Sequence, residues 1–303
     1  MTTYSIHPET RLGAVSLTVS DLERSLRFYT EVIGFKLLQQ MQNTALLGSK
    51  ENAPALVLTG QPDAAPLRRH TTGLYHFAIL VPTRLDLARS LRQLAETRYP
   101  VQGASDHLVS EALYLADPDG NGIEIYVDRP RAEWPRRNGQ LLMATDPLDL
   151  DGLMRELEQD DTAWAGLPEQ TQIGHVHLHV ADLDEAENFY GNVLGFDIMF
   201  RYGPSALFVS AGGYHHHLGL NTWAGRGAPP PSANTVGLRH FTVILPDEAE
   251  RSRLLAHLRD SGISFSEAGD VITLRDPSHN GIQLLVASQQ QAPAKALSLE
   301  NAR

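Results

Sequence analysis

The sequence contains no cysteine at any of its 303 positions. Disulfide bonds, zinc–thiolate sites, iron–sulfur clusters and cysteine nucleophiles are therefore excluded. Any metal ion that the protein binds must be held by histidine, aspartate or glutamate side chains.

Positive charge is also scarce, because 25 Lys and Arg residues face 36 Asp and Glu residues and the formal net charge is −11. This balance argues against nucleic acid or an anionic membrane as a partner. No apolar run of about 18 residues is present, so we predict no membrane span. The first residues lack the pattern of a secretory signal, and we expect a cytoplasmic protein.

Histidine, in contrast, is abundant, with 13 residues in the chain. Six of the 13 lie between residues 175 and 217, and they form two clusters: His175, His177 and His179, then His215, His216 and His217. Imidazole nitrogen is a common metal ligand. The clustering is the first indication of a metal site.

An internal repeat organises the chain. Three segments of the first half recur in the second half: residues 12–35 as 173–196, residues 73–82 as 237–246, and residues 117–127 as 276–286. The first pair shares Asp-Leu, Phe-Tyr and Gly-Phe dipeptides at matching positions. Because the repeat covers most of the chain, we interpret it as a duplication.

Each half divides again into two similar units. An alternating strand pattern opens a unit, as in residues 15–19 and 77–81. A helix N-cap candidate follows, at Asp21 and Thr83, and then a helical pattern and short strands. The sequence predicts an α+β fold of four βαβββ modules, which open near residues 12, 73, 173 and 237.

Composition suggests where the halves end. We predict an N-terminal pair of modules over residues 1–130 and a C-terminal pair over residues 172–288. Residues 131–171 begin with a Pro- and Arg-rich stretch and form a linker that contains an amphipathic helix. Residues 289–303 are a polar, loosely ordered tail.

These modules resemble the vicinal oxygen chelate superfamily, which includes glyoxalases, bleomycin-resistance proteins and extradiol dioxygenases. The motif that carries the resemblance is an opening strand followed by DL, FY and a terminal GF. Four-module length and the segments GLYHFAILVP, EALYLADPDGNGIEIYVDRP and SAGGYHHHLGLNTW resemble bacterial catechol 2,3-dioxygenases. The resemblance implies two domains with partly closed mixed β-sheets. It also implies extradiol (meta) cleavage of a small aromatic diol with O₂, and possible homo-oligomers.

The resemblance further implies Fe(II), with Mn(II) possible, on a triad of two histidines and one carboxylate. This donor set occupies one face of the ion and leaves positions for the diol and O₂. The family takes one histidine from the opening strand of each partner module and the carboxylate from the last strand. The matching positions here are Ala14, His76, His175 and His240, with Glu124 and Gln283.

The pairing of the modules decides whether a triad is complete. Sequential pairing leaves Ala14 or Gln283 in each set, and Gln283 is a poor substitute for an anionic ligand. Pairing of the second module with the third unites His76, Glu124 and His175. We favour this crossed pairing on ligand completeness. His177 remains a second candidate for the ligand that we assign to His175.

Three further residues match catalytic positions of the family. Tyr114 precedes Glu124 by ten positions, and His107 lies seven positions before Tyr114. The resemblance implies that both donate or accept hydrogen bonds at the substrate oxygens, and that His216 is the acid–base residue. We expect the histidine run to be a strand, in which His215 and His217 face away from His216.

Other functions of the superfamily stay open at this point. One alternative is a glyoxalase-like isomerase or a hydroquinone dioxygenase, and another is a ligand-binding protein without catalytic activity. The substituents of the substrate would depend on pocket residues such as Tyr202, Phe208 and Trp223. Bound metal would separate the enzymes from the binding protein.

Overall fold

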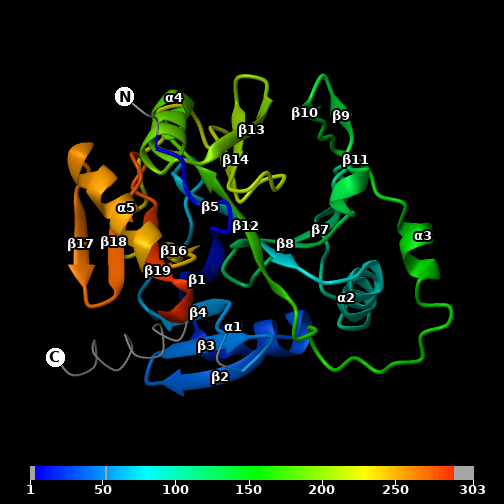
Figure 1. The fold of residues 1–303 in the computed structure, drawn as a ribbon. Coiled ribbons are helices and arrows are strands. Elements are labelled where there is room, and N and C mark those ends of the chain that lie inside the picture. Colours follow the sequence, from blue (N-terminus) through cyan, green and yellow to red (C-terminus); the bar gives the residue numbers. More distant parts are fainter. Residues whose placement is uncertain (1–3, 52, 290–303) are drawn as a thin grey trace.

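The computed structural model describes residues 4–51 and 53–289. The predicted tail, residues 289–303, lies outside the described residues apart from Gln289. Two large mixed β-sheets form the protein, and helices pack on their outer sides (Figure 1).

The first sheet has nine strands. In spatial order they are β11 (Asp146–Pro147), β6 (Gly103–Asp106), β7 (Ser110–Ala116), β8 (Gly122–Asp128), β5 (Gly73–Leu80), β12 (Gln172–His179), β15 (Leu218–Asn221), β14 (Ala206–Ser210) and β13 (Asp197–Tyr202). The sheet thus takes its strands from the second module, the linker and the third module.

The second sheet has eight strands, from the fourth and first modules. In spatial order they are β17 (Phe265–Ala268), β18 (Val271–Arg275), β19 (Gly281–Val286), β16 (Gly237–Leu245), β1 (Arg11–Val19), β4 (Leu56–Gly60), β3 (Thr44–Gly48) and β2 (Lys36–Met41). A small ribbon of β9 (Arg136–Arg137) and β10 (Gln140–Leu141) lies in the linker.

Helices follow the opening strand of every module. They are α1 (Leu22–Arg27) with the π-helix η1 (Phe28–Ile33), α2 (Arg84–Glu96), α4 (Leu183–Glu187) with the π-helix η3 (Asn188–Val193), and α5 (Glu248–Asp260). The linker adds the 3₁₀-helix η2 (Arg131–Glu133) and α3 (Leu150–Arg155), and η4 (Ala287–Gln289) follows the last strand. The predicted α+β fold of four βαβββ modules is confirmed.

The pairing of modules in the structure is crossed. Strand β5 pairs antiparallel with β12, and β1 pairs antiparallel with β16. Each sheet therefore joins strands from both halves of the sequence. The boundaries at residues 130 and 172 describe the duplication, and they stay a prediction as limits of folding units.

Side-chain caps start the helices where the sequence predicts them. Asp21 accepts a hydrogen bond from the backbone N–H of Arg24, and Thr83 accepts one from the N–H of Asp86. These caps satisfy N–H groups that the first helical turn leaves without partners. After α1 the helix widens to a π-helix, which the sequence did not predict, and the adjacent Phe28 and Tyr29 are both buried there.

The Tyr of the repeated FY pair ties the two sheets together. Tyr29 donates its hydroxyl proton to Asp117 at 2.9 Å, and Tyr190 donates to Asp276 at 2.9 Å. Each contact joins a module of one sheet to a module of the other. Both carboxylates are buried, so every donor that they receive offsets the cost of their burial.

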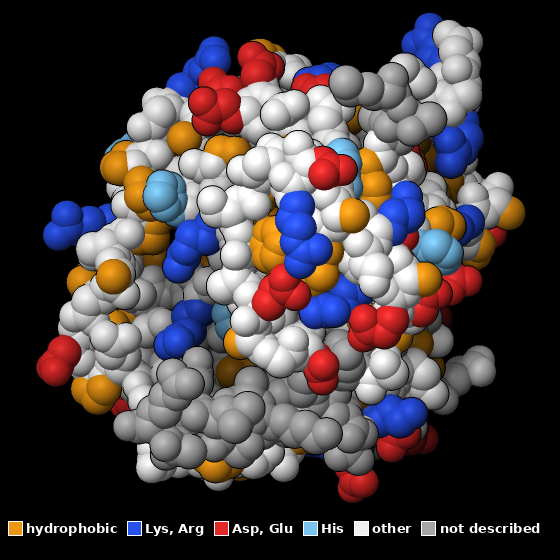
Figure 2. Space-filling view, turned by 60° about the vertical axis from the view of Figure 1, so that its left-hand side comes forward, with side chains coloured by type: hydrophobic (Ala, Val, Ile, Leu, Met, Phe, Trp, Pro, Cys, Tyr) orange, Lys and Arg blue, Asp and Glu red, His pale blue; other side chains and the backbone are white. Residues whose placement is uncertain are grey.

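Charged side chains of both signs are interspersed on the face shown in Figure 2. Hydrophobic side chains on this face occur in small groups between them. No helix among the described residues is long and apolar enough to cross a membrane.

We expect Tyr29→Phe to lower the free energy of unfolding by about 1–3 kcal/mol, because buried Asp117 loses a donor while the ring volume is kept. Urea unfolding followed by circular dichroism measures the change. Tyr202→Phe is the matched control, since Tyr202 is 56% exposed. Equal stability of the two variants would contradict the assigned role of the Tyr29 hydroxyl.

Candidate metal centre and its cavity

Three adjacent strands of the nine-stranded sheet bring together the predicted ligands. His76 lies on β5, Glu124 on β8 and His175 on β12, in the strand order β8-β5-β12. The bulge at Gly174 matters for this arrangement, because a Cβ there would lie 1.7 Å from the hydroxyl of Tyr126. Tyr126 packs against the His175 ring at 4.8 Å between centroids.

The donor atoms converge on one point. Nε2 of His76 and Nε2 of His175 each lie 3.1 Å from the same oxygen, Oε2 of Glu124. All three side chains are buried. Within the part of the chain that the structure describes, these residues are a group of three whose donor atoms lie within 4.8 Å of one another.

This geometry fits a metal ion with a facial donor set. Two donors at about 2.1 Å from one ion and at a right angle lie about 3.0 Å apart. The buried Nε2 of His76 has no hydrogen-bond partner among the described residues, and its lone pair could coordinate an ion at this point. Two imidazoles and a carboxylate are the donors typical of non-haem Fe(II) oxygenases.

The electrostatics keep Glu124 and His175 in the protonation states that ligands require. Burial opposes ionisation of Glu124, but His175 and His76 outweigh burial and hold the pKa of its carboxyl well below the usual value. Burial lowers the pKa of His175 to about 4, although Glu124 acts in the opposite direction. Glu124 is thus anionic and His175 neutral near pH 7.

A cavity of about 410 Å³ opens beside the triad. Its size is within the range of small-molecule sites. Aromatic side chains form much of the wall: Tyr75, Phe200, Tyr202, Phe208 and Trp223. His107, Tyr114, His177 and His216 also line it, and Glu124 is the one acidic residue among the described residues that do so. The predicted pocket residues Tyr202, Phe208 and Trp223 therefore all face this space.

The linker also contributes to the cavity, through Met143, Ala144 and Thr145. We predicted a linker here and missed these residues. The signal in the sequence is a short apolar run, residues 141–144, which is too weak to place a pocket wall.

His107 and Tyr114 form a hydrogen-bonded pair in the cavity wall. Nδ1 of His107 donates to the carbonyl oxygen of Ala144 at 2.6 Å, so Nε2 of a neutral ring accepts from the Tyr114 hydroxyl at 2.6 Å. Burial and the nearby Glu124 raise the pKa of Tyr114 well above its usual value. Tyr114 is therefore a neutral phenol that faces the triad.

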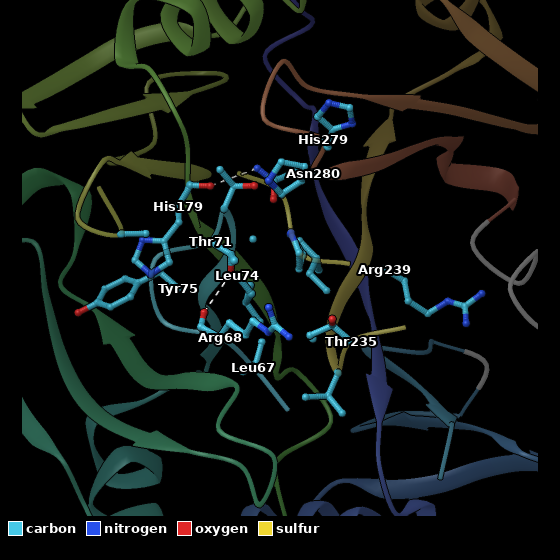
Figure 3. Close-up of a pocket in the computed structure, with 18 of the residues that line it drawn as sticks. Leu67, Arg68, Thr71, Leu74, Tyr75, His179, Thr235, Arg239, His279 and Asn280 are labelled. Carbon is cyan, nitrogen blue, oxygen red and sulfur yellow. Dashed lines mark hydrogen bonds between the residues drawn. The ribbon is translucent and has the colours of Figure 1, made fainter. Parts of the chain in front are cut away.

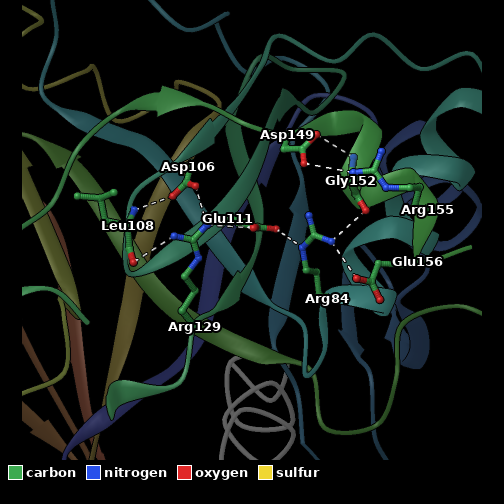
Figure 4. A network of polar contacts seen from close by, with 9 residues as sticks. All are labelled: Arg84, Asp106, Leu108, Glu111, Arg129, Asp149, Gly152, Arg155 and Glu156. Atoms are coloured by element: carbon green, nitrogen blue, oxygen red, sulfur yellow. Dashed lines mark hydrogen bonds and ion pairs between the residues drawn. The ribbon is translucent and has the colours of Figure 1, made fainter. Parts of the chain in front are cut away.

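A network of charged side chains holds the turn that carries His107 (Figure 4). Asp106 accepts from the N–H of Leu108 at 2.8 Å, and Leu108 has a φ of 68°. Arg129 pairs with Asp106 at 2.6 Å and with Glu111 at 3.1 Å. A left-handed φ is unfavourable for a branched side chain, so these contacts fix a turn that would otherwise relax.

The same network reaches the linker helix α3. Arg84 pairs with Glu111 at 2.7 Å, and it also donates to the carbonyl oxygen of Gly152 at 3.0 Å and to Glu156 at 2.9 Å. The linker is thus anchored to the second module beside the cavity.

The histidine run of residues 215–217 is not the strand that we predicted. Strand β15 begins at Leu218, and the three histidines lie in the irregular segment before it. His216 lines the cavity, whereas His215 and His217 are not among its lining residues, and Nδ1 of His215 lies 2.7 Å from Nδ1 of His216. The prediction of a strand was wrong, so strand alternation does not explain which of the three histidines lines the cavity.

His177 lies beside the triad and outside it. It pairs with His76 across the two strands, and its ring lies over Gly219, where a Cβ would come within 2.7 Å of the ring. Its Nε2 is buried without a hydrogen-bond partner. The converging donor is His175, which is the residue that we ranked first of the two.

The second sheet has the equivalent positions without the ligands. Register places Ala14 where the first sheet has His175, His240 in place of His76, and Gln283 in place of Glu124. Burial lowers the pKa of His240 from 6.5 to about 4. His240 is thus a neutral histidine without a carboxylate at the matching position.

A larger cavity, of about 1020 Å³, lies between the two sheets (Figure 3). Tyr75, Gln102, Gly122 and Trp223 line both this cavity and the one beside the triad. Figure 3 shows Tyr75 and His179 on one side and Arg68 directed toward the middle. No Asp or Glu is among its lining residues.

Comparison with known proteins agrees with this architecture. The chain belongs to the Glyoxalase/Bleomycin resistance protein/Dioxygenase superfamily, whose model matches residues 11–125 and 172–284. Within it, the chain is 49% identical to a catechol-2,3-dioxygenase of Bacillus subtilis (strain 168) over 276 residues, which are 90% of this chain and 96% of the relative. The prediction of a catechol 2,3-dioxygenase-like member of the superfamily is confirmed.

More distant relatives share parts of the chain or the fold. A biphenyl-2,3-diol 1,2-dioxygenase of Rhodococcus globerulus is 32% identical over 124 residues, covering 39% of this chain and 63% of the relative. Glyoxalase I from Zea mays superposes with a TM-score of 0.58 at 18% identity and covers 97% of this chain and 98% of its own. At that identity the likeness shows the fold alone.

We expect Glu124→Ala to weaken binding of Fe(II) and Mn(II) by more than about 100-fold, because it removes the anionic donor that faces both histidines. Anaerobic titration of the metal-free protein measures the affinity. Gln283→Ala, at the equivalent position of the second sheet, is the matched control and should leave binding unchanged. Full affinity in Glu124→Ala would show that the ion binds elsewhere.

His240 predicts a pH dependence of stability. Its pKa is about 4 in the folded protein and 6.5 in a free side chain, so the unfolded chain binds the additional proton between these values. His240 therefore contributes full stability above pH 6.5, and this contribution is lost as the pH falls toward 4. Between pH 7 and pH 4, we expect the free energy of unfolding of His240→Gln to fall by about 1–3 kcal/mol less than that of the wild type.

Urea unfolding at a series of pH values measures this difference. The comparison with wild type cancels the contributions of the other buried histidines. Parallel stability profiles of wild type and His240→Gln would contradict the role of His240.

Proposed function

We propose that the protein is an Fe(II)-dependent extradiol dioxygenase that opens the ring of a catechol-type diol with O₂, beside the two hydroxyl groups. The observation that carries the proposal is the buried triad of His76, Glu124 and His175 at the end of a cavity that also contains three protic side chains. The 49% identity to a catechol-2,3-dioxygenase supports it. We place the activity in the cytoplasm.

His76, Glu124 and His175 would hold the ion. When bound, the ion would lower the pKa of a diol hydroxyl and supply the site for reaction with O₂. We favour Fe(II) because two histidines and one carboxylate on one face are typical of Fe(II) oxygenases, and the same donors accept Mn(II).

His216 would be the acid–base residue. It is buried, it lines the cavity, and its ring lies 4.1 Å from that of His175 between centroids. A neutral imidazole at this place can accept a proton from the second hydroxyl of the diol and return it later in the reaction. Tyr114 and His107, which are hydrogen-bonded to each other and line the same cavity, would hydrogen-bond the substrate oxygens.

The walls of the cavity indicate which diols fit. Aromatic side chains and Met143 offer apolar contact to a planar ring, and no Lys or Arg of the described residues lines the space. A carboxylate substituent would be buried without a cationic partner, which is costly. We therefore propose that the substrate is catechol or a derivative with uncharged substituents.

A glyoxalase-like isomerase fits the cavity less well. The triad has a single carboxylate, and His216, Tyr114 and His107 would have no assigned role in that reaction. In a binding protein without metal, the buried carboxylate of Glu124 between two histidines would have no assigned role.

We expect the wild-type protein, loaded with Fe(II) without oxygen, to consume O₂ and catechol in equal amounts and to form a yellow ring-opened product. His216→Asn should lower kcat by about 10²–10⁴-fold, because general acid–base catalysis contributes that much. An oxygen electrode and absorbance spectroscopy measure both quantities.

Metal content is measured in the same samples, and His257→Gln, outside the cavity, is the control. A His216→Asn variant with normal kcat would refute the acid–base role. Absence of catechol turnover in metal-loaded wild type would refute the proposed function.

A further inference from the structure

A chain of hydrogen bonds leads from His216 away from the cavity. Nδ1 of His216 lies 2.7 Å from Nδ1 of His215, and Nε2 of His215 lies 2.8 Å from Oδ1 of Asp128. Asp128 is the last residue of strand β8, the strand that also carries Glu124. Neither His215 nor Asp128 lines the cavity.

The environment of the two outer members differs. The side chain of His215 is fully buried, under the rings of Tyr214 at 4.1 Å and Trp134 at 5.3 Å. Trp134 comes from the linker and is held by a hydrogen bond of its indole N–H to the carbonyl oxygen of Arg129. The side chain of Asp128 is 24% exposed, so its carboxylate also reaches water.

This arrangement determines which nitrogen atoms carry protons. A carboxylate only accepts hydrogen bonds, so Nε2 of His215 must donate to Asp128. When Nε2 of a neutral imidazole carries the proton, Nδ1 of the same ring has a lone pair, so Nδ1 of His215 can accept. Nδ1 of His216 then donates to it. Nε2 is left as the unprotonated nitrogen of His216, whose side chain lines the cavity.

We propose that Asp128 and His215 are positioning residues that fix His216 in the tautomer with a free Nε2 lone pair. The inference rests on the proposed function, in which His216 accepts a proton from the diol. In that step the O–H bond of the substrate breaks, its electron pair stays on oxygen, and a new N–H bond forms at Nε2. Asp128 then faces, through His215, the positive charge that His216 gains.

A parallel exists in the general chemistry of histidine sites. A ring nitrogen that donates to a carboxylate or another acceptor sets which nitrogen of the same ring is free to react. Here the acceptor is a second histidine, and the carboxylate acts one residue further away. The rings of His215 and His216 lie 4.7 Å apart between centroids.

The tautomer is measured directly by long-range ¹H–¹⁵N correlation spectra of the metal-free protein with labelled histidine. In the wild type, we expect His216 to be protonated at Nδ1 and unprotonated at Nε2. The substitution His216→Asn assigns its signals. Asp128→Ala removes the acceptor, so we expect both His215 and His216 to become mixtures of tautomers.

Kinetics of the Fe(II)-loaded protein give the second readout. We expect Asp128→Ala to lower kcat by about 10–100-fold while KM for catechol stays within about twofold, since Asp128 does not touch the cavity. Asp128→Asn keeps an amide oxygen as acceptor and should restore much of kcat. Glu133→Gln, an exposed carboxylate nearby in the chain, is the control for the change of charge.

Two results would overturn the inference. One is a wild-type His216 protonated at Nε2, and the other is an Asp128→Ala protein with unchanged tautomers and kcat. If Asp128→Ala does not fold, the tautomer of His216 in the wild-type spectrum and the kcat of Asp128→Asn still test the inference. The wild type could show the expected tautomers and yet not turn over catechol. That result would support the hydrogen-bond chain and would refute only the proposed function.

Discussion

The antiparallel pairing of β5 with β12 is the contact on which the candidate site depends. It places His76 and His175 on neighbouring strands, and the parallel neighbour β8 adds Glu124. The alternative pairing of modules would join His76 and Glu124 with Ala14, and His175 with His240 and Gln283, so neither set would be complete. The tyrosine–aspartate contacts between the sheets join sequential modules at the same time, so both connections act together to give one arrangement.

Burying the carboxylate of Glu124 costs free energy, and only the first of the two sheets has a carboxylate at this position. A carboxylate in this position is held ionised by two imidazoles, and the triad remains a set of donors around one point. The second sheet keeps the same register but has Ala14 and Gln283 at the matching positions, so its His240 needs no anionic partner. Duplication thus produced two equivalent frameworks and one set of converging donors.

The modules could be predicted from the sequence because they depend on local patterns such as the cap at Asp21 and the FY pair. The triad positions followed from the resemblance to the superfamily, and the crossed pairing followed from ligand completeness. The ten-residue spacing from Tyr114 to Glu124 corresponds to direct pairing of these residues across β7 and β8. The contact of His215 with His216 could not be predicted, because it depends on an irregular segment where strand alternation does not apply. The linker's contact with the cavity, through Met143, is likewise a tertiary feature without a periodic signal.

The central claim is that one metal ion binds between the second and third modules. Diffraction from crystals grown with Fe(II) or Mn(II), recorded at the absorption edge of the metal, tests it most directly. The account predicts one anomalous peak within about 2.5 Å of the donor atoms of His76, Glu124 and His175. A peak beside His240, or none at the triad in metal-loaded crystals, would contradict it.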